Sequence, residues 1–520
     1  MGQFLLLGLC VTSGFGVFLH GYNSGLVAHV IANEHFLRFF DTKQSSSIVA
    51  AVVSVFAGGC VLGSLCAGFF LDLIGRKRTI QAGAIINIVG TVVQAASVGL
   101  TMMMIGRIIS GFAIGFTQTA VPIYLAECST RKNRGFVTGW SQLMVTMGFV
   151  ATSWVGYASS KVPNAAHNAF TWRFPISIAA IPSIFIAFAL NWLPESPRYL
   201  VRKGMTEQAY RVLVRLYYDG SNRLDLQRDI HQITIKWNRE ILEGGADGDS
   251  EWKLCFTVPK YRKRLIVAIL SQVLTQCTGI NMITYYQGDM FENVGIKDSK
   301  GLLLGAIYSM VAPVTCFFAQ VFLIDRIGRK PMLYFGSVAL PILFIVFAAV
   351  MASNEKSGYE DGALTKLNIA VMFFFNVFFQ LSWGIVGWVM YGEVMPLRIR
   401  GKGGAIAAGV GNWAVNCLIS QVTPLAMEKL SWKYYFFYSA FMLCVTLPTV
   451  HYVFKETKGL SLEELDSLWD APTNDSFQSL EDGSVNAVPG KGEVGLDPQA
   501  QLEMVVPGSR YQRGRFRPGR

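Results

Sequence analysis

The sequence predicts an all-α polytopic membrane protein with twelve transmembrane helices arranged as two six-helix bundles. Charged residues make up only 15% of the 520 residues and hydrophobic residues 52%, whereas a soluble protein has about 25% charged residues. Apolar stretches near twenty residues recur along the chain, and each is long enough to cross a hydrocarbon core of ~30 Å. Two charged motifs also occur once in each half, as expected for a protein built from two repeated membrane units.

Twelve spans are expected from these apolar stretches, and their boundaries are less certain than their centres. The centres lie near Gly14, Cys60, Asn87, Gly111, Met147, Ile184, Val273, Val311, Leu343, Phe378, Gly411 and Val445. The first apolar run, residues 4–26, follows no basic segment and shows no clear cleavage site, so it is interpreted as a span and not as a signal peptide.

The net charge of +11 reflects membrane topology and does not indicate nucleic-acid binding. Basic residues cluster in alternate loops, as at Arg76-Lys77-Arg78 and Arg398 to Lys402. Positive charge marks the cytoplasmic face, and twelve spans then place both termini in the cytoplasm. We expect an integral protein of the plasma membrane, working as a monomer in contact with the lipid bilayer.

Four segments follow from the order of the spans. Residues 1–193 and 263–454 are expected to hold six spans each. Residues 194–262 form a cytoplasmic linker with short helices, and residues 455–520 form a tail whose Gly, Ser, Pro and charge content predicts mostly disorder. The nine cysteines have no metal-ligand spacing. No catalytic site, metal or cofactor is expected, so the chain is not interpreted as an enzyme.

The repeated charged motifs are expected to form a gate on the cytoplasmic side. The first motif, Asp72-x-x-Gly75-Arg76-Lys77, returns as Asp325-x-x-Gly328-Arg329-Lys330. The second, Glu127 with Arg134-Gly135, returns as Glu393 with Arg400-Gly401. A carboxylate beside such a turn can accept from free N–H groups at the next helix start and pair with arginine. Asp72 and Asp325 are predicted in that role, with Glu127 and Glu393 pairing with arginines across helices.

Further segments, taken in order, make the chain resemble the sugar porter family of the major facilitator superfamily, most closely its fungal branch. They are His20-Gly21-Tyr22-Asn23-Ser24-Gly25, Gly106-Arg107, Pro122 to Glu127, Trp172-Arg173, Pro194-Glu195-Ser196-Pro197-Arg198, Gln276 with Gly279-Ile280-Asn281, Asn412-Trp413 and Glu456-Thr457-Lys458-Gly459. The resemblance covers residues 10–466 and implies the major facilitator fold and alternating-access transport. It also adds Glu195 to the gating network.

The substrate implied is a neutral sugar or polyol, and the polar residues inside apolar spans suit it. Each sugar hydroxyl both donates and accepts, as does a side-chain amide, and polar groups at membrane depth are costly unless they face a cavity or a partner. The candidate binding residues are Gln142, Gln272, Gln276, Asn281, Gln380, Trp388, Asn412 and Asn416. The other interpretation of each amide is a hydrogen bond between helices that holds the bundle together.

The chain departs from the family pattern at positions that bear on substrate and energy coupling. Thr275 replaces one of two glutamines, Pro313 stands where Asn is frequent, and Ile385 replaces a proline at an expected gate hinge. These changes leave a hexose, a pentose or a polyol open as substrate.

Asn23 replaces the aspartate that proton symporters of the family place near the position of Arg107. An amide cannot titrate, so facilitated diffusion is predicted. A proton symporter and a non-transporting sugar sensor remain the alternatives.

Overall fold

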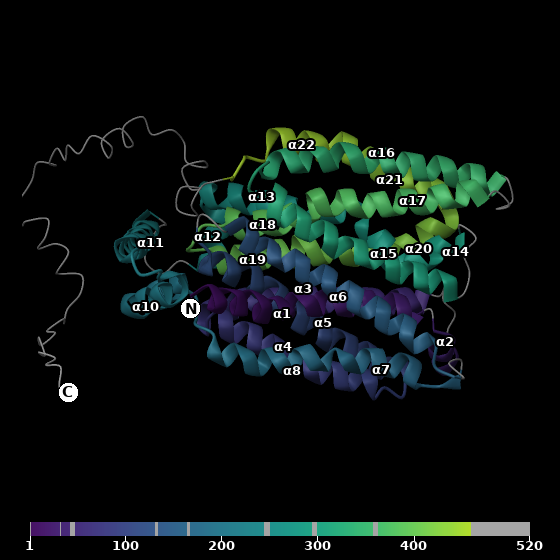
Figure 1. Cartoon of the computed structure of the whole chain (residues 1–520), viewed down its shortest axis with the longest axis horizontal. Helices are drawn as coiled ribbons and strands as arrows, with labels where there is room; N and C mark the ends of the chain where they lie inside the picture. Colours follow the sequence, from purple (N-terminus) through teal and green to yellow (C-terminus); the bar gives the residue numbers. More distant parts are fainter. Residues whose placement is uncertain are drawn as a thin grey trace, which may run out of the picture. The chain divides into compact units, whose positions relative to one another are not determined.

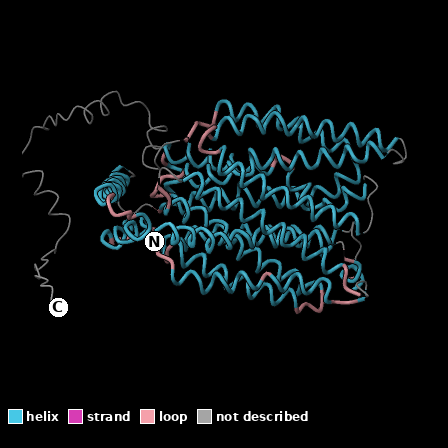
Figure 2. Tube along the Cα trace, viewed as in Figure 1, coloured by secondary structure: helices cyan, strands magenta, loops and turns pink. Residues whose placement is uncertain are grey.

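The computed structural model is built from helices, and no strand occurs in the part that it describes (Figure 2). The described residues are 2–31, 33–41, 47–130, 134–163, 167–243, 250–293, 299–356 and 362–458. The predicted tail beyond residue 458, including Gly459 at the end of the family motif that starts at Glu456, lies outside them.

The first half of the chain forms one group of long helices (Figure 1). Its helices are α1 (Gly2–Ile31), α2 (Glu34–Phe39), α3 (Ser47–Leu73), α4 (Arg76–Ala95), α5 (Leu100–Cys128), α6 (Arg134–Ser160), α7 (Phe170–Ile178) and α8 (Ala180–Ala189), followed by the 3-10 turn η2 (Leu190–Trp192). Within this group α5 packs against both α3 and α4, and α1 packs against α6.

Four shorter helices follow and lie at the end of the bundle that carries the N-terminus (Figure 1). They are α9 (Pro197–Arg202), α10 (Thr206–Tyr217), α11 (Arg223–Glu243) and α12 (Glu251–Thr257). The apolar side of α10 is buried through Ala209, Leu213 and Leu216, and its other side carries charged residues, as expected for a surface helix.

The second half is also helical, but several of its helices are interrupted by π-helical turns. Its α-helices are α13 (Pro259–Gln276), α14 (Ile280–Asn293), α15 (Ser299–Phe318), α16 (Arg329–Lys356), α17 (Gly362–Phe379), α18 (Ile385–Val394), α19 (Arg400–Ile406), α20 (Val415–Leu430), α21 (Tyr434–Phe441) and α22 (Leu447–Tyr452). The π-helical segments are η3 (Ala319–Leu323), η4 (Gln380–Gly384), η5 (Ala407–Ala414) and η7 (Met442–Thr446), and η6 (Ser431–Lys433) is a 3-10 turn.

The π-helical segment η4 occupies the place where the sequence lacks the hinge proline. It ends at Gly384, directly before Ile385. A π-turn leaves the regular hydrogen-bond ladder without needing a proline, so this helix keeps an irregular point at the expected hinge. Pro313, by contrast, lies inside the continuous helix α15.

The centres of all twelve predicted spans lie within helices. Eight helical stretches of the described residues are long and apolar enough to cross a membrane, and the last of them, Arg400–Tyr452, contains two of the predicted spans. Three predicted spans, α4, α6 and α13, are not among these stretches because they carry more polar side chains. The polar residues of α6 and α13 face a cavity between the two halves.

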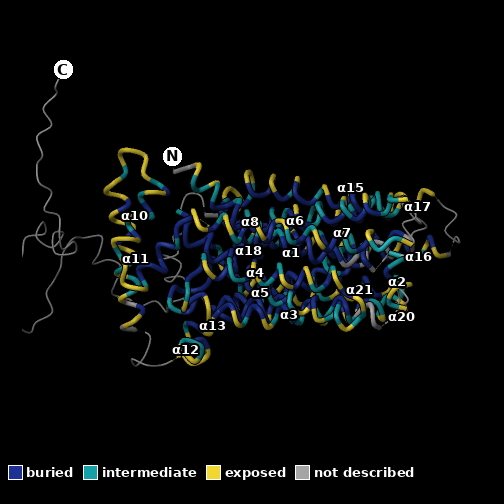
Figure 3. The backbone as a smooth tube through the Cα atoms, turned by 90° about the horizontal axis from the view of Figure 1, so that it is seen from below, coloured by how far each residue is buried: buried dark blue, intermediate teal, exposed yellow. Residues whose placement is uncertain are grey.

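Apolar side chains fill the interior of the bundle and also cover much of its outside. Figure 3 shows exposed residues along the outer turns of the helices, and many of them are large and apolar, such as Phe188, Val314 and Leu418. A soluble protein rarely exposes a continuous apolar surface of this kind. The outer surface of the long helices therefore fits contact with lipid.

Candidate functional site

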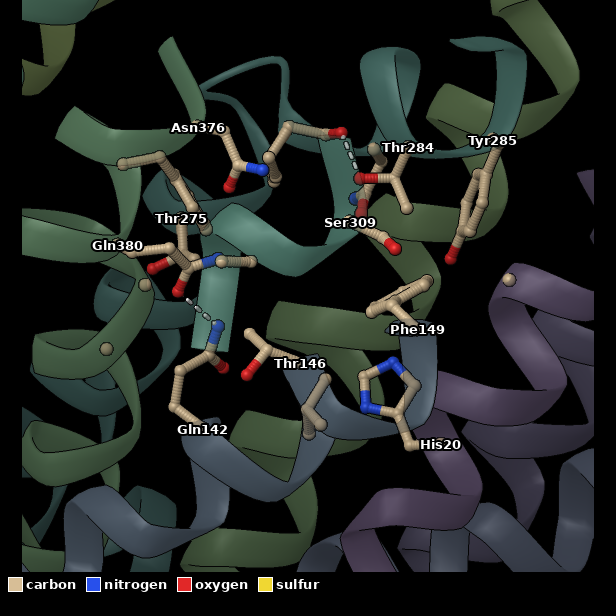
Figure 4. Close-up of a pocket in the computed structure, with 18 of the residues that line it drawn as sticks. His20, Gln142, Thr146, Phe149, Thr275, Thr284, Tyr285, Ser309, Asn376 and Gln380 are labelled. Carbon is tan, nitrogen blue, oxygen red and sulfur yellow. Dashed lines mark hydrogen bonds between the residues drawn. The ribbon is translucent and has the colours of Figure 1, made fainter. Parts of the chain in front are cut away.

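A cavity lies between the two halves and is lined mainly by the second half (Figure 4). Its empty space, including the part open to solvent, is about 950 Å³. Helices α1 and α6 line it from the first half, and α13, α14, α15, α17, α18, η4 and η5 from the second. Among its described lining residues there is no Asp, Glu, Lys or Arg, so the cavity suits an uncharged ligand.

Four of the predicted amides form one hydrogen-bonded group at this cavity, here called the amide cluster: Gln276, Asn281, Asn412 and Asn416. Gln276 donates to Asn412 and accepts from Asn281. The Nδ2 of Asn416 lies 3.4 Å from Gln276 Oε1 and 3.0 Å from the hydroxyl of Tyr285. Gln276 is the centre of the cluster because its side chain contacts the other three.

The remaining predicted binding residues lie around the same cavity. The Nε2 of Gln142 donates to Gln380 Oε1 at 3.0 Å, which joins α6 of the first half to η4 of the second. Gln272 donates to the backbone carbonyl of Gly387 at 3.0 Å. Trp388 also lines the cavity. Every predicted binding residue is a lining residue except Asn416, which reaches the cavity through Gln276.

Several lining residues were not among the predicted binding residues. On α6, Thr146, Phe149 and Ser153 follow Gln142 at intervals of three and four residues, which places all four on one helix face. The sequence spacing could therefore have predicted that these residues line the cavity together with Gln142. His20, Tyr308 and Asn376 also line the cavity, but nothing in an apolar stretch tells which side of the helix such a residue faces.

Asn23 and Arg107 are neighbours, as predicted, although they meet through the backbone. The Asn23 side chain donates to the carbonyl of Leu19 at 2.9 Å. The Arg107 guanidinium lies 3.4 Å from the Asn23 carbonyl oxygen and 4.6 Å from the Phe56 ring centroid, and it is 3% exposed. No carboxylate of the described residues pairs with it, so this buried cation is held by backbone oxygens and an aromatic face.

Four predicted gating residues of the first half, Asp72, Arg76, Glu127 and Glu195, lie together with Ser196, which was not predicted. These five residues are here called the first charged cluster. Arg76 is fully buried and contacts both oxygens of Glu127, at 3.0 and 2.9 Å. The Arg400 guanidinium, from the second half, lies 3.6 Å from the same carboxylate. Glu127 therefore neutralises two buried guanidiniums, one from each half of the chain.

The corresponding residues of the second half form the second charged cluster: Asp325, Arg329, Glu393, Glu456 and Thr457. Arg329 lies 3.0 Å from Glu393 and 3.2 Å from Asp325. The hydroxyl of Thr457 donates to Glu393 at 2.9 Å, as that of Ser196 donates to Glu127. Arg134, predicted as the counterpart of Arg400, has a side chain outside the described residues.

The sequence predicted that Asp72 and Asp325 accept hydrogen bonds from the free N–H groups at the helix starts. In the structure Glu195 and Glu456 accept these bonds instead. Glu195 accepts from the backbone N–H of Arg76 and Lys77, and Glu456 accepts from that of Arg329 and Lys330. The aspartates lie one turn earlier and instead face the other half, where Asp72 packs against Gly401 and Asp325 against Gly135. Glu456 and Thr457 therefore take the places in the second charged cluster that Glu195 and Ser196 take in the first. Neither residue was predicted to belong to the gate.

The linker helices contact both halves around the first charged cluster. Arg202 of α9 lies 2.6 Å from both Asp72 and Glu251, and Lys402 lies 2.7 Å from Glu251 and 3.8 Å from Asp72. Burial alone would raise the pKa of Glu251, but the nearby Arg202 and Lys402 lower it below its ordinary value. Glu251 thus remains charged and joins a linker cation to a second-half cation.

A second linker contact lies at the end of α11. Glu240 accepts from the backbone N–H groups of Leu397 and Arg398, at 3.3 and 2.7 Å. These residues belong to the loop that precedes α19. The linker is therefore attached to the second half at Glu240, while Tyr217 attaches it to the first half by donating to the carbonyl of Cys128.

Comparison with known proteins gives one consistent family. The model of the family described as "Sugar (and other) transporter" matches residues 9–469. The MFS-type transporter criB of Aspergillus cristatus is 33% identical over 487 residues, which cover 93% of this chain and 98% of that protein. The hexose transporter HXT10 of Saccharomyces cerevisiae is 30% identical over 485 residues, covering 89% and 85%.

Two further comparisons bear on the alternatives. The high glucose sensor RGT2 of Saccharomyces cerevisiae is 31% identical over 491 residues, covering 91% of this chain and 62% of the sensor. Among solved structures, the proton:xylose symporter XylE bound to 6-bromo-6-deoxy-D-glucose has a TM-score of 0.79 and 23% identity, covering 90% of this chain and 100% of that one. The structural likeness establishes the major facilitator fold with its two six-helix bundles.

Proposed function

This chain belongs to the family of sugar and other transporters, and we propose that it carries a monosaccharide or a polyol across a membrane by alternating access. The observation that carries the proposal is the cavity between the halves, which is uncharged in its described lining and bordered by the amide cluster. An amide both donates and accepts, so it can bond a hydroxyl that acts as acceptor or as donor. Trp388 offers a flat apolar face to the C–H side of a sugar ring.

The charged clusters act as the gate on the linker side. Arg400 and Glu127 join the two halves, as do Lys402 and Asp72. These contacts must break when the cavity opens on the linker side. The free energy of the contacts therefore determines how much of the protein is open on that side. In this arrangement the linker side is closed, and the carrier cycle alternates between this state and one in which the cross-half contacts are broken.

Facilitated diffusion is the transport mode that Asn23 supports. Proton coupling needs a group that gains and loses a proton as access alternates, and an amide at this position cannot do so. Arg107 is already held by carbonyl oxygens and Phe56, so it does not depend on a carboxylate partner. We expect sugar to move down its gradient only.

The remaining assignments follow from the same topology. The chain divides at 1–193, 194–262, 263–454 and 455–520, with the linker and both termini in the cytoplasm. It works as a monomer in the plasma membrane, is not an enzyme, and binds neither nucleic acid nor a cofactor. The basic loops around Arg76 and Arg398 support this orientation by the positive-inside rule.

Uptake in cells that lack their own sugar carriers tests the function. Radiolabelled hexoses, pentoses and polyols are supplied to cells expressing the chain or its Gln276→Ala variant. Saturable uptake of at least one compound, lost or weakened in the variant, is expected. If the protein is at the cell surface and no compound enters, the transport function is wrong.

Two other functions remain as outcomes of this experiment. Uptake that a protonophore abolishes within seconds would make the chain a symporter, like the structural relative XylE. A protein at the surface that moves no sugar but changes gene expression when sugar is added would be a sensor, like the relative RGT2.

A further inference from the structure

His20 is a polar side chain in the cavity that the proposed transport mechanism has not used. It lies on α1 and lines the cavity, and its ring projects into the open space (Figure 4). The ring meets that of Trp413 edge-on, with 4.9 Å between the centroids. Its Nδ1 atom is buried and has no hydrogen-bond partner in the described part of the chain.

This unpaired nitrogen distinguishes His20 from the amides. Gln276, Asn412 and Asn281 are bonded to one another, and Gln142 is bonded to Gln380. A side-chain amide has two N–H donors and two acceptor lone pairs, so these amides can bond a ligand although their polar atoms are already partly satisfied. A ligand that bonds His20 satisfies a buried nitrogen that has no partner, and it removes the cost of that unpaired group, which is roughly 1–3 kcal/mol.

The geometry allows one imidazole nitrogen to reach a ligand. Rotation about the bond between Cβ and the ring is broad, so either nitrogen can turn toward the cavity. A neutral imidazole has one donor and one acceptor nitrogen, which matches a hydroxyl as well as an amide does. The only other buried lining atom without a partner, among the residues described, is the Tyr308 hydroxyl on the opposite half.

We propose that His20 contacts the substrate and determines specificity by hydrogen-bonding one hydroxyl group of the neutral sugar or polyol. The proposal rests on the proposed transport function and names the first-half contact of that site. The amide cluster of the second half binds the ligand, and His20 of the first half forms a hydrogen bond with one of its hydroxyl groups. Stereoisomers and deoxy analogues that lack a hydroxyl there should be the compounds that the carrier discriminates against.

The test uses the full-length protein and three substitutions on one helix. His20→Phe keeps an aromatic ring against Trp413 but removes both nitrogens, and His20→Gln keeps a donor and an acceptor. His29→Phe is the matched control, because His29 is also an α1 histidine with buried, unpaired ring nitrogens but does not line the cavity. The labelled compound is whichever member of the hexose, pentose and polyol panel the wild-type protein takes up.

KM and maximal rate are measured for this compound and for its series of monodeoxy analogues, supplied as competitors. His20→Phe should raise KM about three- to tenfold, as expected for one hydrogen bond, with little change in maximal rate, whereas His20→Gln and His29→Phe should stay near wild type. One deoxy analogue should bind the wild type more weakly than the parent compound by a similar factor. The affinity of that analogue should be the same for His20→Phe as for the wild type.

The outcomes separate this proposal from the function on which it rests. If the wild type takes up a panel compound and His20→Phe weakens every deoxy analogue equally, or if His29→Phe has the same effect, His20 does not read a hydroxyl. If the wild type takes up no compound, the proposed function itself fails and the proposal fails with it. If His20→Phe does not reach the surface, His20→Leu tested against the deoxy series decides, because loss of discrimination against one deoxy analogue supports the proposal and unchanged discrimination overturns it.

Discussion

The two charged clusters have the same chemistry but different surroundings. In the first, Asp72 is 9% exposed and also meets Arg202 and Lys402. In the second, Asp325 is 44% exposed and pairs with Arg329 of its own turn. A buried ion pair with several partners couples more strongly than an exposed one, because water screens the exposed pair. The repeated motif therefore forms two turns of similar shape. We expect the ion pairs of the first charged cluster to contribute more to holding the gate closed.

The halves also differ in their backbones. The π-helical segments η3, η4, η5 and η7 all belong to the second half of the described chain, and η4 and η5 contribute Gln380 and Asn412 to the cavity. π-helical turns mark places where a helix departs from regular geometry, often at functional sites. We infer that the two halves have different roles. The first half contains the more buried charged cluster, while the second half contributes most of the cavity lining and contains the irregular helical turns.

The largest difference between the halves is expected for Glu127→Gln compared with Glu393→Gln. Removing one partner of a buried ion pair costs about 3–5 kcal/mol, and among the described side chains Glu127 contacts both Arg76 and Arg400, whereas Glu393 contacts Arg329. Thermal unfolding of the purified proteins should show a clearly larger fall in Tm for Glu127→Gln. Equal falls would mean that Arg400 does not depend on Glu127.

The next difference concerns the ligand. Gln276→Ala should raise KM about tenfold or more, because it disconnects Asn281, Asn412 and Asn416 at once and leaves buried polar groups unpaired. Gln142→Ala frees only Gln380 and should raise KM a few-fold. Gln81→Ala serves as control, since Gln81 bonds to Asn191 away from the cavity. A larger effect at Gln142 than at Gln276 would place the main grip in the first half.

A smaller difference is expected at the aspartates. Asp72→Asn weakens contacts to Arg202, Arg76 and Lys402 and should change the maximal transport rate about five- to tenfold. Asp325→Asn should change it by about twofold or less, since an exposed pair contributes below ~1 kcal/mol. Initial rates, corrected for the amount of protein at the surface, measure both. A larger effect from the exposed Asp325 would contradict the assignment of the gate to the first cluster.

The two glycine turns should show no difference between the halves. Gly75 and Gly328 have φ of 95° and 104°, and an added Cβ would press on Glu195 and Glu456, respectively. Gly75→Ala and Gly328→Ala should each cost roughly 1–3 kcal/mol in stability, seen as similar falls in Tm. Unequal falls would show that the two turns are not equivalent, despite their matching hydrogen bonds.

Much of this architecture could be predicted from the sequence, because the signals were long or repeated. Apolar runs of span length predicted the twelve helices. The duplicated motifs predicted that Glu127 and Glu393 pair with arginines, while the structure identifies Arg76 and Arg400 for Glu127 and Arg329 for Glu393. The amides within apolar spans predicted many of the residues that line the cavity, since a polar group within a span must face a cavity or a partner.

The rest depends on contacts between distant segments. Glu456 and Arg329 are far apart in the chain, and no local pattern indicates that one caps the helix of the other. The links from Arg202 through Glu251 to Lys402 depend on where the linker folds back. The π-helical turns arise from packing, and the exposure of His20 to the cavity depends on how α1 is rotated within the bundle.

Passive transport of a neutral solute is the central claim, and accumulation in proteoliposomes tests it most directly. The purified protein is reconstituted, a proton gradient is imposed, and the labelled compound that the cells take up is followed to its plateau. We predict that the internal concentration rises to the external concentration and stops there, with or without the gradient. Accumulation above the external concentration that collapses when a protonophore is added would contradict the account, and would mean that protons are coupled without a carboxylate at Asn23.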